Sequence, residues 1–147
     1  MLLDDMLGNH PWEIFGSDIS SRVLKTAQQG HYQLHRIDGI PKEYLRKYCL
    51  KGVGEHDGTL LVDKTLRKKV TFSSVNLKMP LRNLGLFDII FLRNVLIYFD
   101  QATKKHVVER IAKALKPGGH FFISHSESLH RVTDHLEMVK PSIFIKR

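Results

Sequence analysis

Several features that mark whole classes of protein are scarce in this sequence. Its 147 residues include a single cysteine, Cys49, so the chain cannot form an internal disulfide. No apolar run approaches the roughly 18 residues that cross a membrane, and the opening residues lack the positive flank and long apolar stretch of a secretory signal. Repeats and low-complexity segments are also lacking. We therefore expect a reduced, cytoplasmic protein without membrane insertion.

Acidic side chains are outnumbered, because 23 Lys and Arg accompany 15 Asp and Glu and give a formal net charge of +8. The excess is spread over both halves of the chain, with its densest clusters at residues 46–51 and 64–69. Such clusters are either solvated faces or docking surfaces for an acidic partner. No helix-turn-helix, zinc-finger or aromatic RNA-binding pattern accompanies the charge, so we expect no nucleic-acid partner.

The first half of the chain reads as a strand and two helices. The 42% hydrophobic content of the full sequence suits a globular protein, and its 147 residues suit one continuous domain. Residues 12–17 are short and apolar and predict a buried strand. A helix should follow, which Ser20 or Ser21 can cap and Gly30 can end. Pro41 opens a second predicted helix.

The middle of the chain changes character. Residues 59–62 and 70–72 are short β-prone pieces around a basic linker, and glycines before them mark turns. We expect these two pieces to form a small antiparallel excursion rather than another strand covered by helices.

The second half predicts a parallel crossover. Residues 87–92 are almost continuously apolar, which is typical of a strand with both faces covered. Asp100 or Thr103 can cap the next helix, which the Pro-Gly-Gly turn at 117–119 should end before a strand at 120–123. A closing hairpin is expected at residues 136–146. These elements predict an α/β protein with an open, mostly parallel sheet.

Polar residues directly after the predicted strands are candidate ligand contacts, because open α/β sheets bind ligands beyond the carboxyl ends of their strands. Asp18 can either accept hydrogen bonds from two ribose hydroxyls or cap the following helix. Asn76 can offer a donor and an acceptor to a base edge. Arg93 and Asn94 either contact a ligand or form an ordinary polar strand end.

The run from Phe87 to Asp100 strongly resembles the signature of CheR-type chemotaxis receptor methyltransferases, which use S-adenosylmethionine to methylate glutamate side chains on chemoreceptors. A Lys-Pro-Gly-Gly turn alone would indicate only some methyltransferase, whereas the run through Tyr98 is far more specific. The resemblance covers essentially the whole chain, and further segments match family motifs: residues 14–19, 75–77, 116–119 and 125–129.

The resemblance implies a Rossmann-like S-adenosylmethionine-dependent methyltransferase fold over residues 1–147, with an antiparallel β-subdomain at about residues 50–72. The family's N-terminal helical domain, first central strand and glycine-rich loop find no match here, so the domain reads as N-terminally truncated. Loss of a central strand would leave two unpaired inner strand edges. We expect those two strands to pair directly or to form a homodimer with a second copy.

The resemblance also assigns roles to individual residues. S-adenosylmethionine would be the cofactor, S-adenosylhomocysteine the product, and the cytoplasmic domain of a chemoreceptor the partner. Asp18 would bind the ribose, and Tyr98 would face the transferred methyl group as the catalytic residue. The adenosine side would be lined by Asn76, Leu77, Arg93 and Asn94. A Gly-x-Gly loop that binds a receptor peptide in some members would comprise Lys51, Gly52, Gly54 and Gly58.

A second hypothesis is a protein-binding module that has lost cofactor competence but keeps the basic antiparallel surface for a chemoreceptor or another acidic partner. A metal site is not expected. Gly30 argues against a helix that would align His31 with His35, and the later histidines lack a recognisable ligand spacing: His125, His130 and His135.

Overall fold

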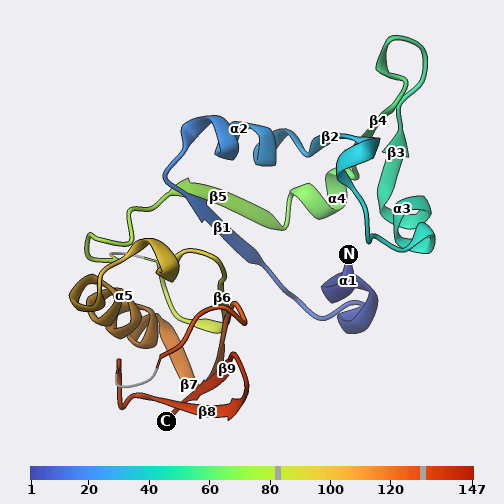
Figure 1. Cartoon of the computed structure of the whole chain (residues 1–147). Coiled ribbons are helices and arrows are strands. Elements are labelled where there is room, and N and C mark those ends of the chain that lie inside the picture. The colour runs from blue at the N-terminus through green and yellow to red at the C-terminus, as the bar shows by residue number, and fades with distance from the viewer. Residues whose placement is uncertain (82–83, 130–131) are drawn as a thin grey trace. The chain divides into compact units, whose positions relative to one another are not determined.

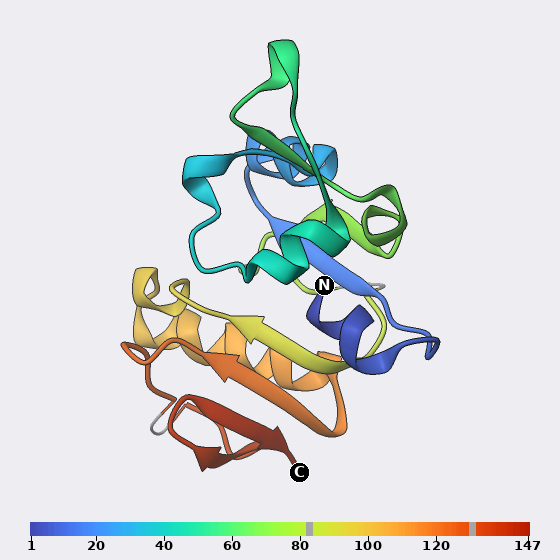
Figure 2. The ribbon, with the colours of Figure 1, turned by 90° about the vertical axis from the view of Figure 1, so that its right-hand side faces the viewer.

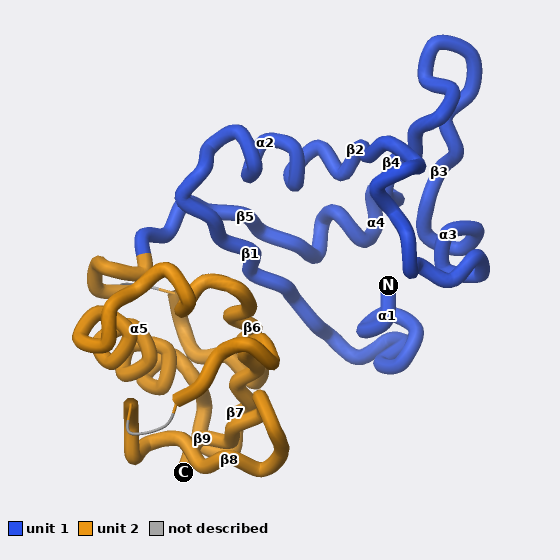
Figure 3. Tube along the Cα trace, in the orientation of Figure 1, with its two compact units in different colours: residues 1–76 blue, residues 77–147 orange. Residues whose placement is uncertain are grey.

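The computed structural model describes residues 1–81, 84–129 and 132–147. Its contacts cluster into two compact units, residues 1–76 and 77–147, which Figure 3 colours blue and orange. The first unit has two sheets and the second has one, and each unit has its own buried side chains; the single continuous domain stays a prediction.

The first unit contains a two-stranded parallel sheet of β1 (Ile14–Asp18) and β5 (Val70–Ser74). Helix α2 (Ser21–Gln29) packs on both strands and follows the predicted limits (Figure 1). The Ser20 hydroxyl caps it by accepting from the Val23 amide at 3.4 Å, and Gly30 ends it in a left-handed conformation. The prediction that this first strand is buried is wrong, because Ile14 is 40% exposed.

The same unit also contains a three-stranded antiparallel sheet. Its order is β2 (His31–Gln33), β4 (Thr59–Val62) and β3 (Cys49–Lys51). The antiparallel part therefore starts at residue 31 and ends at residue 62, which corrects the expected range of about 50–72. The basic linker forms α4 (Lys64–Arg67), which carries the chain to β5, and β5 pairs in parallel with β1. We call residues 31–62 the β-subdomain.

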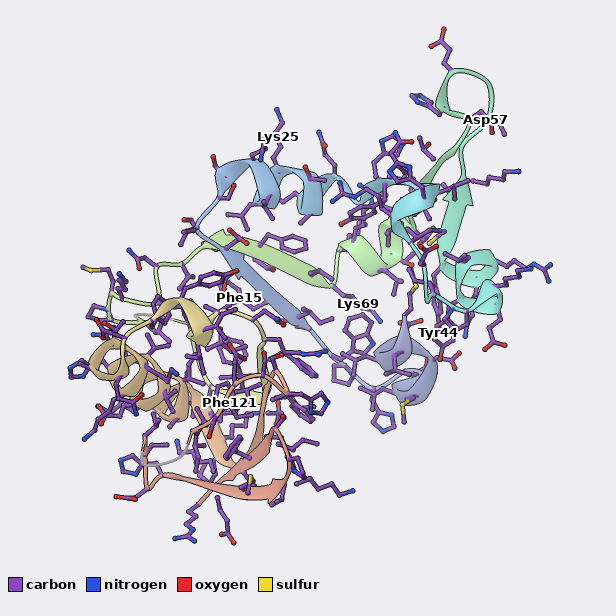
Figure 4. All side chains as sticks on the ribbon, viewed as in Figure 1. Phe15, Lys25, Tyr44, Asp57, Lys69 and Phe121 are labelled. Carbon is purple, nitrogen blue, oxygen red and sulfur yellow. The ribbon has the colours of Figure 1, made fainter. Side chains whose placement is uncertain are left out.

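Helix α1 (Leu2–Leu7) is fastened within the first unit by ion pairs. The Lys47 ammonium on α3 (Lys42–Tyr48) lies 2.6 Å from the Asp5 carboxylate. The Lys69 ammonium lies 2.9 Å from Asp4 and 4.5 Å from the centre of the Trp12 ring; Figure 4 labels this lysine. These contacts attach the first helix to the β-subdomain and to the segment before β5.

The second unit is built on a four-stranded sheet. Its order is β6 (Phe87–Leu92), β7 (Leu115–Ile123), β9 (Ile143–Lys146) and β8 (Leu136–Lys140). Strands β6 and β7 are parallel and are joined through α5 (Gln101–Ala114), which confirms the predicted crossover (Figure 2). Strands β8 and β9 form the predicted hairpin.

Two details of this unit differ from the sequence predictions. Within this unit, α5 covers the face of β6 that carries Ile90 and Leu92, whereas Ile89 is 47% and Phe91 67% exposed on the other face. Helix α5 ends at Ala114, and the Lys-Pro-Gly-Gly segment lies inside β7 instead of forming a separate turn. A register shift opposite Phe87 and Ile89 accommodates it, because proline cannot donate a backbone hydrogen bond to the neighbouring strand.

A buried apolar cluster between α5 and the sheet forms the core of the second unit. Phe121, labelled in Figure 4, is one of its large side chains and is 0% exposed. The Asp100 carboxylate caps α5 by accepting from the Thr103 amide at 2.7 Å, as predicted. The cluster comprises Leu92, Leu96, Val107, Val108, Ile111, Ala112, Leu115, Phe121, Ile123, Leu129, Val132, Leu136 and Phe144.

Strand β1 lies in the two-stranded sheet of the first unit and β6 in the four-stranded sheet of the second, and direct pairing of these two strands stays a prediction. Pairing between two copies of the chain stays a prediction. Within the described ranges, no helix is both long enough and apolar enough to cross a membrane.

Candidate functional site

Asp18 and Asn76 come from the same end of the parallel sheet in the first unit. Asp18 is the last residue of β1 and is paired in register with Ser74, the last residue of β5. Asn76 lies two residues after Ser74. Val75, which separates these two residues, donates its amide hydrogen to the Asp18 carbonyl at 3.3 Å. The fold therefore brings together two of the predicted ligand residues at the carboxyl end of this sheet.

The Asp18 side chain contributes to the start of α2 and has acceptor capacity beyond it. Its Oδ1 atom accepts from the Ser20 amide at 2.8 Å, and Ser20 then caps the helix. An ionised carboxylate offers about four acceptor positions, so one bond to Ser20 leaves enough for a pair of ribose hydroxyls. The half-buried carboxylate thus fits a nucleoside as well as the local turn.

Arg93 and Asn94 follow the end of β6 in the second unit, with exposed side chains. Asn94 has a φ of 59°, a left-handed conformation that asparagine adopts more readily than most residues. The next residues turn into a short 3-10 helix, η3 (Leu96–Tyr98), whose first side chain is fully buried. The segment therefore places two polar side chains at the carboxyl end of a parallel strand, as predicted.

Leu77 and Tyr98 also lie in the second unit. The Leu77 carbonyl accepts from the Arg110 guanidinium on α5 at 2.9 Å, so this backbone is fastened to the crossover helix. Tyr98 ends η3 and exposes 79% of its surface, which leaves the phenol accessible to solvent and to an acceptor.

Glu127 is a further candidate that was not predicted from the sequence, although it lies in the segment 125–129 that matches a family motif. The side chain is only 8% exposed and accepts hydrogen bonds from the Asn94, Val95 and Leu96 amides after β6. The sequence shows only that this glutamate lies between two serines, shortly after a predicted strand. That pattern does not indicate which groups donate hydrogen bonds to its carboxylate.

The predicted receptor-binding residues gather on the β-subdomain. Lys51 ends β3 with an exposed side chain, and the loop to β4 carries Asp57, which Figure 4 labels. Gly52 fits only without a side chain, because an added Cβ would clash with the His56 carbonyl oxygen and the Thr59 hydroxyl. Gly54 and Gly58 have φ of 59° and 76°, which glycine adopts without strain.

The ion pair between Lys116 and Asp88 lies away from the candidate site residues that follow β6. Lys116 in the Lys-Pro-Gly-Gly segment lies 2.8 Å from Asp88, near the start of β6 and away from its carboxyl end. The hydrogen bond from Lys116 holds the pKa of the Asp88 carboxyl below its usual value. Across the described ranges, no three His, Cys, Asp or Glu side chains are placed to hold a metal. His130 lies outside the described residues.

A family model described as "CheR methyltransferase, SAM binding domain" matches residues 1–145. The chain belongs to this family. The predicted resemblance and the predicted methyltransferase fold are thereby confirmed, and the family's defining cofactor is S-adenosylmethionine (SAM).

Curated chemotaxis protein methyltransferases agree with this assignment. The chain is 42% identical to the one from Salmonella typhimurium over 129 residues, covering 86% of this chain and 45% of the relative. It is 39% identical to that of Escherichia coli over 140 residues, covering 93% and 48%. The chain thus spans about half the length of these CheR relatives.

Solved structures show a weaker likeness. The glycopeptide N-methyltransferase MtfA complexed with SAM is 16% identical with a TM-score of 0.48, covering 92% of this chain and 44% of that one. LepI in complex with SAM is 15% identical with a TM-score of 0.46, covering 83% and 22%. Because both scores are below 0.5, the CheR assignment rests on the sequence matches.

Proposed function

We propose that this chain is the cofactor-binding part of an enzyme that transfers a methyl group from SAM to glutamate side chains of chemotaxis receptors. The observation that carries the proposal is the family match over residues 1–145, in which the predicted ligand residues follow the ends of parallel strands. Methylation in chemotaxis is the function named for the curated relatives.

The residues of each unit fit a part of the adenosine moiety. In the first unit, Asp18 would accept from the ribose hydroxyls while its Oδ1 atom keeps the bond to Ser20, and Asn76 would meet the base. In the second unit, the segment after β6 would line the adenosine side with Arg93 and Asn94, together with Leu77.

The proton chemistry that this reaction asks of the protein is modest. When bound, SAM supplies a methyl group on a sulfonium centre, an electrophile that a carboxylate can attack. A glutamate side chain with a pKa of about 4.3 is already ionised at neutral pH, so no strong general base is needed. The Tyr98 hydroxyl would donate to the acceptor carboxylate and orient it, and the exposure of this tyrosine supports that role.

The β-subdomain supplies a candidate contact for the receptor. Lys51 ends β3 with an exposed cationic side chain, and the following loop, which also carries Glu55 and Asp57, has no room for a side chain at Gly52. An acidic side chain of a receptor segment could pair with the exposed Lys51 ammonium. We place the receptor contact at Lys51, Gly52, Gly54 and Gly58.

Calorimetry with S-adenosylhomocysteine tests the proposal. We expect the wild-type chain to bind it, and Asp18→Asn to weaken binding about tenfold to a hundredfold, because the bonds from the ribose hydroxyls lose a charged acceptor. An asparagine oxygen can still accept from the Ser20 amide, so the start of α2 and the thermal stability should be preserved. The matched control is Asp38→Asn, an exposed aspartate of the same unit.

Two results would contradict the cofactor-binding role. Equal affinity of the wild-type chain and Asp18→Asn would remove Asp18 from the site. Failure of the wild-type chain to bind would favour the second hypothesis, a protein-binding module for an acidic partner.

A further inference from the structure

Glu127 is a buried carboxylate whose hydrogen-bond partners are four backbone amides. Its Oε1 atom accepts from Val95 at 3.0 Å and from Leu96 at 2.8 Å. Its Oε2 atom accepts from Asn94 at 3.2 Å and from Ser124 at 2.8 Å. Both oxygens are therefore satisfied by main-chain donors within the second unit.

The donors come from two places in the sequence that parallel pairing brings together. Ser124 follows the last residue of β7, whereas Asn94–Leu96 follow the last residues of β6, the neighbouring strand. The Glu127 amide in turn donates to the Ser124 carbonyl at 3.0 Å, which closes a tight turn. Glu127 thus joins the carboxyl ends of two adjacent parallel strands.

Burying the Glu127 carboxylate costs free energy unless both of its oxygens accept hydrogen bonds. A carboxylate that is only 8% exposed loses most of its hydration, and charge-assisted bonds from N–H groups compensate for that loss. Removing the carboxylate would also leave up to four amides without their acceptor in a region of low exposure. The side chain and the backbone conformation around it are therefore mutually dependent.

The backbone that Glu127 holds is the one that carries the candidate ligand residues. Three consecutive amides point to one carboxylate, and Asn94 adopts its left-handed φ of 59° at the first of them. Leu96, fully buried, begins the 3-10 helix that ends at Tyr98. The orientation of both Asn94 and Tyr98 therefore depends on the same anchor.

We propose that Glu127 is a positioning residue that holds the segment Asn94–Leu96 in its ligand-binding conformation. Glu127 touches neither cofactor nor substrate and acts only through this backbone. Its effect on binding rests on the proposed function, whereas its hold on the segment is a property of the chain alone.

The first test measures the backbone directly. Amide hydrogen exchange by NMR is recorded for the wild-type chain and for Glu127→Gln, which keeps the side-chain size but offers one acceptor oxygen and two unwanted donors. We expect exchange at Asn94, Val95 and Leu96 to accelerate about tenfold or more in this variant. The matched control, Glu137→Gln, removes an exposed carboxylate that is ion-paired with Arg147 and should leave these amides unchanged.

A second readout measures affinity for S-adenosylhomocysteine. Weakening of about tenfold in Glu127→Gln, with the rest of the exchange pattern intact, supports the positioning role. Unchanged exchange at residues 94–96 overturns the inference, and so does unchanged affinity in a variant whose segment has loosened. If the wild-type chain binds nothing, the proposed function fails, and the exchange rates alone decide whether Glu127 holds the segment.

A conservative variant covers the case in which Glu127→Gln does not fold. Glu127→Asp keeps the charge but shortens the reach, so we expect faster exchange at Asn94 and Val95 with the Ser124 bond retained. If the amides of Asn94, Val95 and Leu96 all exchange at the wild-type rate in Glu127→Asp, the inference is overturned.

Discussion

Tyr98 is a site residue whose contribution can be separated from folding. Because 79% of its surface is exposed, loss of its hydroxyl should not disturb packing. We expect Tyr98→Phe to lower the turnover of methyl transfer about tenfold while affinity for S-adenosylhomocysteine changes less than twofold, since the hydroxyl would orient the acceptor and not the nucleoside. Transfer of labelled methyl groups to a receptor fragment, measured at saturating cofactor, checks this.

The control for Tyr98→Phe is Tyr32→Phe, which removes a hydroxyl from β2 in the other unit. This variant should turn over at the wild-type rate. A loss of nucleoside affinity in Tyr98→Phe, or equal turnover in the two variants, would count against an acceptor-orienting role.

At the level of elements, the loop between β3 and β4 depends on the absence of a side chain at Gly52. Its amide donates to the Thr59 carbonyl at 2.9 Å, and a Cβ there would lie 1.9 Å from the His56 carbonyl oxygen. We expect Gly52→Ala to lower the free energy of unfolding by about 3 kcal/mol, because the hairpin must open to relieve a backbone clash. Urea unfolding followed by circular dichroism measures this.

Gly54 provides the matched comparison within the same loop. An added Cβ at Gly54 meets no heavy atom within 4 Å, so only its φ of 59° opposes a side chain. The expected cost of Gly54→Ala is about 1 kcal/mol. Similar losses in the two variants would show that the conformation of the loop, and not the clash at Gly52, sets its stability.

At the level of the whole molecule, aspartates distributed over both units make the stability sensitive to acid. Each has a pKa below its usual value because the native chain donates a hydrogen bond to the carboxylate. The donors are Lys69 to Asp4, Lys47 to Asp5, Thr65 to Asp63, Lys116 to Asp88 and the Thr103 amide to Asp100.

A carboxyl whose pKa is lower in the folded than in the unfolded chain stabilises the fold above the unfolded value, about 3.9 for aspartate, and that stabilisation is lost as the pH falls through the folded value. Protonation also raises the net positive charge, which starts at +8. We therefore expect the melting temperature to be steady from about pH 7 to pH 5 and to fall below about pH 4.

Thermal unfolding by circular dichroism between pH 7 and pH 2.5 checks the acid sensitivity. Asp88→Asn removes one of the contributing groups, so its melting temperature should fall less steeply with acid than that of the wild-type chain. A melting temperature that rises on acidification would contradict the assigned directions of the pKa shifts.

The sequence by itself determined the features that depend on near neighbours. The limits of α2 and the start of α5 follow from Ser20, Gly30 and Asp100, whose side chains or conformations act within a few residues. The crossover from β6 through α5 to β7 follows from local periodicity, and the family follows from contiguous motifs.

Only the tertiary structure decided which strands are neighbours and which polar groups share a bond. Strand β5 resembles the β-subdomain strands in composition, yet it pairs with β1, more than fifty residues earlier in the chain. Three of the four amides that donate to Glu127 lie more than thirty residues before it, and nothing in the local sequence indicates that they converge on its carboxylate. Pairing and burial are properties of contacts between distant segments, so they become visible only when the chain is folded.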